Sequence, residues 1–173
     1  MSFERESRYP IPGGAASGDV NRVLIKDSCR FTSTAAIPTY VGSGTGTLTA
    51  AVNGAFPVTD GVTAVVGDRF LLRHGASGID NGIYRFVAIG ALGAKWQLIR
   101  TSDANTSAEV KSGMFVHVDI GTANIDTWWT LTTPNPIVLE TTALTFTAAA
   151  ATMDHGLLLG LGDSADQDRK SVV

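Results

Sequence analysis

The chain has 173 residues, a length that suits one domain with its own hydrophobic core, or a smaller domain with an extended segment at each end. Charged residues make up 17% of it, below the roughly 25% typical of soluble domains, which favours burial of surface against other subunits. The net charge of -3 comes without a dense basic run and argues against a nucleic-acid partner, and a single cysteine excludes an intrachain disulfide and a thiolate zinc site.

Residues 1–47 predict an extended N-terminal arm that carries one short strand and a linker. The first 19 residues mix charges with prolines and glycines, which suits an extended chain better than a helix. They do not fit a secretory signal, and we expect no membrane-spanning segment anywhere in the chain. The apolar run 23–25, with β-branched residues at both ends, predicts the strand, and residues 35–47 return to the Pro, Gly, Ser and Thr of a linker.

Residues 48–147 predict a β domain. Short apolar runs recur roughly every eight to twelve residues between Gly, Asp and Asn, a spacing typical of antiparallel all-β domains. The expected fold class is therefore all-β, as an antiparallel β-sandwich or barrel-like domain. Asn81-Gly82 tolerates the positive φ angles of a turn, so residues 70–73 and 83–89 are expected to pair as antiparallel neighbours.

Two further strands and one helical turn are expected in this domain. Alternation over 114–120 predicts one buried set: Met114, Val116, Val118 and Ile120. Of the adjacent indoles Trp128 and Trp129, one is expected to enter the core and the other to stay at a rim or interface. Thr106 and Glu109 form a capping-box pattern that predicts about one turn of helix.

Residues 148–173 predict a short C-terminal oligomerisation or docking tail. Four of the five residues from 157 to 161 are leucines, and so short a segment cannot bury them by itself. We expect these leucines to lie in an interface between copies of the chain: Leu157, Leu158, Leu159 and Leu161.

The residue types that carry catalysis form no recognised motif. The three histidines fall on different predicted elements, and although His117 and Asp119 share a strand face that could hold a metal or a proton, half-exposed strands often carry such pairs without function. The aspartates 80, 103 and 126 lie in turns, where Asp commonly bonds to backbone N–H groups. Residues 42–46 lack the Lys-Ser/Thr ending of a phosphate-binding loop. We predict no catalytic residues, no metal, no cofactor and no enzymatic activity.

Two aromatic residues are candidates for surface recognition. Trp128 and Tyr84 would offer flat apolar faces on which sugar rings can stack if they were exposed. A glycan is therefore kept as a ligand of this surface. Large aromatics in a small β domain are more often core residues, and this reading stays open beside the first.

A series of short motifs follows in a fixed order through the β domain: Val66-Gly67-Asp68-Arg69-Phe70-Leu71-Leu72, Asn81-Gly82-Ile83-Tyr84, Trp96 with Arg100, Asp103-Ala104-Asn105-Thr106, Gly113-Met114-Phe115-Val116-His117-Val118, Trp128-Trp129-Thr130-Leu131-Thr132-Thr133 and Leu144-Thr145-Phe146. In this order they resemble a module recurrent in virion proteins of tailed bacteriophages, particularly tail-fibre and related structural proteins. Residues 154–163 are similar to a His-Gly-x-Leu-x-Gly-Leu-x-Asp segment of trimeric phage fibres. Residues 164–170 depart from the acidic and His run that follows it there.

The resemblance implies a non-enzymatic virion structural protein, a homotrimer that is assembled in the host cytoplasm and binds the major capsid protein or another virion protein. Because too few residues follow Asp163 to build a fibre shaft, we expect a small capsid decoration or cement protein that bridges capsomers. The alternative is a tail-fibre, adaptor or host-glycan-binding module of the tail. A polysaccharide depolymerase is the least favoured reading, and the sequence leaves head and tail locations open.

Overall fold

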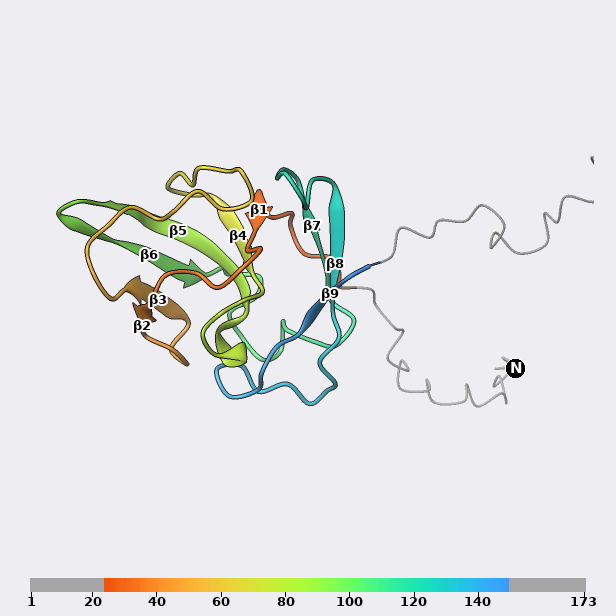
Figure 1. Ribbon diagram of the computed structural model, residues 1–173. Coiled ribbons are helices and arrows are strands. Elements are labelled where there is room, and N and C mark those ends of the chain that lie inside the picture. Colours follow the sequence, from red (N-terminus) through yellow and green to blue (C-terminus); the bar gives the residue numbers. More distant parts are fainter. Residues whose placement is uncertain (1–23, 150–173) are drawn as a thin grey trace, which may run out of the picture.

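A computed structural model describes residues 24–149 (Figure 1), and these residues confirm the all-β class. Nine strands and one short 3-10 turn follow one another along them. In chain order they are β1 (Phe31–Thr32), β2 (Tyr40–Val41), β3 (Thr47–Ala50), β4 (Arg69–Leu72), η1 (Gly78–Asp80), β5 (Gly82–Ala91), β6 (Ala94–Arg100), β7 (Phe115–Val118), β8 (Thr127–Leu131) and β9 (Phe146–Ala148). Within this part of the chain no helix is long and apolar enough to cross a membrane.

The strands form two sheets that pack together as a sandwich-like domain (Figure 1). The six-stranded sheet has the order β1-β4-β5-β6-β3-β2, and the three-stranded sheet has the order β7-β8-β9. The expected antiparallel pairing is confirmed, since β4 pairs with β5 with Phe70 opposite Tyr84. The loop between these two strands contains η1, which the sequence pattern did not indicate.

One face of the six-stranded sheet is covered by an aromatic core. Phe70 and Phe86 project from the sheet, and Phe56 packs against both from the loop between β3 and β4. The centroid of the Phe56 ring lies 5.7 Å from that of Phe70 and 4.8 Å from that of Phe86. Trp96 meets Phe56 edge-on at 5.3 Å. Such tilted and edge-to-face pairs add to the stabilisation that large aromatic rings gain by burial. The loop therefore serves as the second layer on this face.

The opposite face is covered over part of its area by the three-stranded sheet. Leu71 and Ile83 point from the large sheet into this inter-sheet core. The small sheet and the segments beside it contribute buried residues: Cys29, Met114, Val116, Val118, Trp129, Leu131 and Phe146. Because β4 is covered on both faces, the consecutive residues Phe70, Leu71 and Leu72 are all buried and apolar.

The alternation of the later strands was predicted well. Trp129 is buried and Trp128 is exposed, as expected of two adjacent strand residues. The expected core set on β7 is confirmed except for Ile120, which lies past the end of the strand and is exposed. A single turn of helical hydrogen bonding is also present, since the N–H of Val110 bonds to the carbonyl of Thr106 at 3.2 Å and the carboxylate of Glu109 accepts the backbone N–H of Thr106 at 3.0 Å.

The predicted domain boundary at Leu48 is wrong for the described residues before it. Residues 24–30 run parallel to β7, with Cys29 opposite Val118, and the chain then crosses to the other sheet, where β1 pairs with β4. β2 pairs with β3, so the expected linker also contributes a strand. Strands of two residues carry almost no periodicity, which is why the pattern indicated a linker. Residues 1–23 and 150–173 lie outside the described residues.

Candidate interaction surfaces

The outer face of the three-stranded sheet carries the exposed indole. Trp128 on β8 is 42% exposed, and its direct partner across the strands is His117 on β7. The two rings lie with their centroids 4.9 Å apart at 55°. The side chains on this outer face therefore form an amphipathic aromatic surface, of the kind enriched where proteins meet partners.

A short hydrogen-bond chain continues from this aromatic pair. Nδ1 of His117 lies 3.0 Å from Oδ1 of Asp119, and the hydroxyl of Ser28 donates to Oδ2 of the same carboxylate at 2.9 Å. Ser28 thus bonds to the acid and not to the imidazole, so the three residues lack the nucleophile-to-base contact of a catalytic triad. No group of three metal-ligating side chains occurs among residues 24–149. The arrangement is suited to recognition by hydrogen bonds.

Both ends of the described domain lie beside this small sheet (Figure 1). At one edge Phe115 of β7 donates its N–H to the carbonyl of Leu24 at 2.8 Å, and at the other edge Ala149 donates to the carbonyl of Trp128 at 2.8 Å. The segments before and after the described residues therefore join the domain at the sheet that carries Trp128. The four leucines of the predicted interface, Leu157, Leu158, Leu159 and Leu161, lie outside the described residues.

Tyr84, the second candidate for surface recognition, is buried, so the core reading holds for this residue. Its position on β5, in the middle of the large sheet, leaves the ring covered. The hydroxyl donates to the carbonyl of Asp80 at 2.7 Å, and the Arg100 guanidinium lies 4.9 Å from the ring centroid. Burial raises the pKa of the phenol. The residue is a structural anchor and cannot stack on a glycan.

The carboxylate of Asp80 organises the loops at the end of this sheet. It accepts hydrogen bonds from the hydroxyls of Tyr40 (2.8 Å) and Ser43 (2.7 Å) and from the N–H of Gly44 (2.9 Å). The raised pKa of Tyr40, about 12, follows from its burial and from this neighbouring acid. The expectation that Asp80 is a structural turn residue is confirmed by these bonds, which reach across the chain to another loop.

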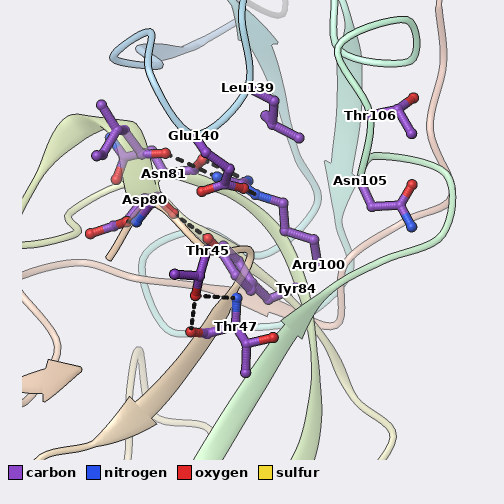
Figure 2. Close-up of polar contacts among 12 residues, drawn as sticks. Thr45, Thr47, Asp80, Asn81, Tyr84, Arg100, Asn105, Thr106, Leu139 and Glu140 are labelled. Carbon is purple, nitrogen blue, oxygen red and sulfur yellow. Dashed lines mark hydrogen bonds and ion pairs between the residues drawn. The ribbon is translucent and has the colours of Figure 1, made fainter. Parts of the chain in front are cut away.

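Arg100 and Glu140 form a second buried polar group beside it (Figure 2). The guanidinium donates to the carbonyls of Asn81 at 3.0 Å and Ile79 at 2.9 Å, and its Nε bonds to Oε1 of Glu140. Oε2 of Glu140 is buried and has no hydrogen-bond partner among the described residues. An unpaired buried carboxylate oxygen lowers the stability of the fold, so this ion pair is held at a cost.

The large sheet is open to solvent beyond the area that the small sheet covers. Four side chains on adjacent strands form one row across this surface: Thr47, Ile99, Arg85 and Arg69. We call this row and its surroundings the open half. Sequence reasoning missed it because the row joins residues from four separate strands, and only the strand register brings them together.

Two adjoining hollows occupy the open half. The larger, of about 510 Å³, is lined by Arg69, Arg85 and Ser102, and the smaller, of about 250 Å³, by Thr47 and Glu140. Three lining residues belong to both: Ile99, Arg100 and Asn105. Together they make a mixed polar and apolar groove, which suits a ligand with both hydroxyl groups and a charge.

The single cysteine, Cys29, is buried between the sheets. Burial raises the pKa of the thiol to about 12, so the thiolate is not populated near neutral pH. The thiol is packed in the core between the two sheets and has no place in a reactive site.

No known protein family, curated protein or solved structure matches this chain. The surfaces described above are therefore the structural features that bear on function. Of these surfaces, the outer face of the small sheet is the one from which both flanking segments continue.

Proposed function

We propose that this chain is a non-enzymatic structural protein of a tailed-bacteriophage virion, a small capsid decoration protein that stabilises the head by bridging capsomers. It is assembled onto the particle in the host cytoplasm, and its partner is the major capsid protein. One observation carries the proposal. The first and last described residues, Leu24 and Ala149, both bond to the small sheet, which also carries the exposed Trp128.

This arrangement supports docking because one side of the domain combines three means of attachment. The outer face of the small sheet offers an aromatic surface, and the outer edge of β9 has no strand beside it among the described residues. Free strand edges accept a further strand from a partner, and the chain that continues from this side of the domain can add contact area. A protein that bridges neighbouring subunits needs several such contacts on one side.

We further propose that the protein acts as a homotrimer through the leucine-rich segment 157–161. Burial of four leucine side chains against other copies stabilises an oligomer by several kcal/mol, at about 1.5–3 kcal/mol for each side chain. Light scattering on the full chain should give three times the monomer mass, and the double substitution Leu158→Asp, Leu161→Asp should reduce it to the monomer mass. A monomeric full chain at all concentrations would remove this part of the proposal.

Docking onto the head is tested by sedimentation with expanded, undecorated heads built from the major capsid protein of the proposed virion. The full chain should sediment with the heads and saturate, and Trp128→Ala should weaken binding at least tenfold. The control is Leu92→Ala. Leu92 is 98% exposed at the tip of the β5–β6 hairpin, so this change also removes an exposed apolar side chain, but from the large sheet instead of the small one. Absence of binding at every salt concentration would contradict the proposal.

A tail-fibre, adaptor or host-glycan-binding module is the second candidate, and the same residue favours it. The indole of Trp128 and the imidazole of His117 could stack on and hydrogen-bond to a sugar ring. On a glycan array, this candidate requires binding that is lost in Trp128→Ala while the far-UV circular dichroism is retained. Glycan binding without any binding to heads would decide in its favour.

A further inference from the structure

The open half of the large sheet carries one unneutralised positive charge. Arg69 is held by two parallel hydrogen bonds to Asp103, at 3.1 and 2.9 Å, and Arg100 is paired with Glu140. Arg85 is exposed, and it forms no ion pair or side-chain hydrogen bond within the described residues. Of the three arginines that line the larger hollow, only Arg85 is therefore available to an anion.

The position of Arg85 has no evident structural benefit. Its direct partner on β4 is Arg69, another cation, and like charges opposite one another destabilise a strand pair. A planar guanidinium that is free of internal partners offers two parallel donors to a carboxylate, a geometry that lysine lacks. The residue is placed where a ligand carboxylate would relieve the repulsion.

The other end of the groove has the chemistry of a sugar subsite. Glu140 lines this end of the groove, and its carboxylate is a hydrogen-bond acceptor for a hydroxyl, while the amide of Asn105 can both donate and accept. Figure 2 shows Glu140 and Asn105 with the Arg100 side chain between them. The side chain of Ile99, which is 39% exposed, supplies an apolar surface for the C–H groups of a ring.

We propose that the open half binds an acidic oligosaccharide, with a sugar carboxylate on Arg85 and the hydroxyls of an adjacent ring on Glu140 and Asn105. Two adjoining hollows of about 510 and 250 Å³ hold more than one sugar ring and are far larger than an inorganic anion requires. The site is separate from the outer face of the small sheet and does not rest on docking to the capsid.

The test is isothermal titration of the full chain with trimers of galacturonate, mannuronate and sialic acid, beside maltotriose, citrate and inorganic phosphate. At least one acidic trimer should bind with a Kd at least tenfold below those of maltotriose, citrate and phosphate. Equal binding of citrate would show an anion site without sugar recognition and would overturn the proposal. Equal binding of maltotriose, or no binding of any acidic trimer, would overturn it as well.

Two substitutions assign the two ends of the groove. Arg85→Gln should weaken binding of the acidic trimer at least tenfold and abolish its salt dependence, whereas Lys95→Gln, an equal charge change at an exposed residue of the same hairpin, should leave it unchanged. Glu140→Gln should weaken binding several-fold and retain the salt dependence. Unchanged affinity in Arg85→Gln, or equal losses in Arg85→Gln and Lys95→Gln, would refute the assignment.

Discussion

The two faces of the six-stranded sheet differ in how completely they are covered. One face lies under the aromatic core, where Phe70, Phe86 and Trp96 are buried by the loop between β3 and β4. The other face is covered by the small sheet around Leu71 and Ile83, and beyond them it is open. On this face of β4 and β5, the buried pair Leu71 and Ile83 lies only two residues along each strand from the pair Arg69 and Arg85 of the open half.

This difference separates the residues that stabilise the fold from those that are free to serve recognition. On the covered face, a polar side chain would be buried at a cost of several kcal/mol, so the positions require apolar residues. On the open half the same strand positions accept charge, since their side chains reach water. The open half is therefore where binding residues can occur without disturbing either core, and substitutions on the two faces should have very different effects.

The largest expected effect comes from Phe70 on the covered face. Phe70→Ala removes a completely buried ring that contacts Phe31, Phe56 and Phe86, and it should lower the free energy of unfolding by about 4 kcal/mol. Urea denaturation of the full chain, followed by tryptophan fluorescence, measures the change.

The matched substitution on the open half is Ile99→Ala. Ile99 is exposed, so this change should alter the free energy of unfolding by less than about 0.5 kcal/mol. Similar losses from Phe70→Ala and Ile99→Ala would contradict the distinction between the two faces.

The next largest loss of stability is expected at Arg100. This residue of β6 bonds to the loop before β5 and to Glu140 in the loop before β9. Arg100→Met keeps the length of the side chain but removes the donors to Asn81 and Ile79 and leaves the Glu140 carboxylate without its counterion. Removing one partner of a buried ion pair costs about 3 kcal/mol. Thermal unfolding should show this loss.

The double variant Arg100→Met, Glu140→Gln provides the control for this prediction. Since Glu140→Gln removes the uncompensated charge, the double variant should regain part of the stability that Arg100→Met loses. Additive losses would show that the ion pair itself contributes nothing and that only the carbonyl bonds of Arg100 matter.

The sequence predicted strands with one covered face better than strands covered on both faces, and it did not predict the open half. The alternation of β7 and β8 gave the buried set around Val116 and separated Trp129 from Trp128, because one covered face imposes a period of two. Tyr84 was kept as a surface candidate, because β5 is covered on both faces at Ile83 and Tyr84 and only the next residue, Arg85, marks an open face. The row from Thr47 to Arg69 depends on the register of four strands. Residues distant in the chain leave no local pattern, so this candidate site could not be predicted.

A smaller and pH-dependent effect is expected at Asp60, which links the loop over the aromatic core to the turn between β7 and β8. Its carboxylate accepts the backbone N–H groups of Thr122, Ala123 and Asn124, at 3.2, 2.8 and 3.1 Å. Partial burial alone would raise the pKa, but these donors, with the Asn124 amide, hold it below its usual value. The bonds therefore add stability above the unfolded pKa of about 3.9, and this contribution is lost as the pH falls through the folded pKa.

Asp60→Asn tests this link because it removes the charge at nearly constant size. At about pH 7 the variant should be less stable by roughly 1–2 kcal/mol, a range that allows for solvent screening of a partly exposed carboxylate. At about pH 3 or below, where the wild-type acid becomes protonated, the difference should shrink. Urea unfolding at both pH values measures it, and an equal difference at both would show that the charge of Asp60 is irrelevant.

The smallest effect, and the only one of opposite sign, is expected at Arg85 on the open half. Arg85→Thr removes a cation that lies directly opposite Arg69 and introduces a β-branched residue that favours strands, so the free energy of unfolding should rise by roughly 0.2–0.5 kcal/mol. Asp103 already neutralises Arg69, which keeps the gain small. Denaturation at low salt should show the increase, and added salt should reduce it. A loss of stability would instead mean that Arg85 belongs to the structural part of the sheet, and the open half would then no longer differ from the covered face in the role of its residues.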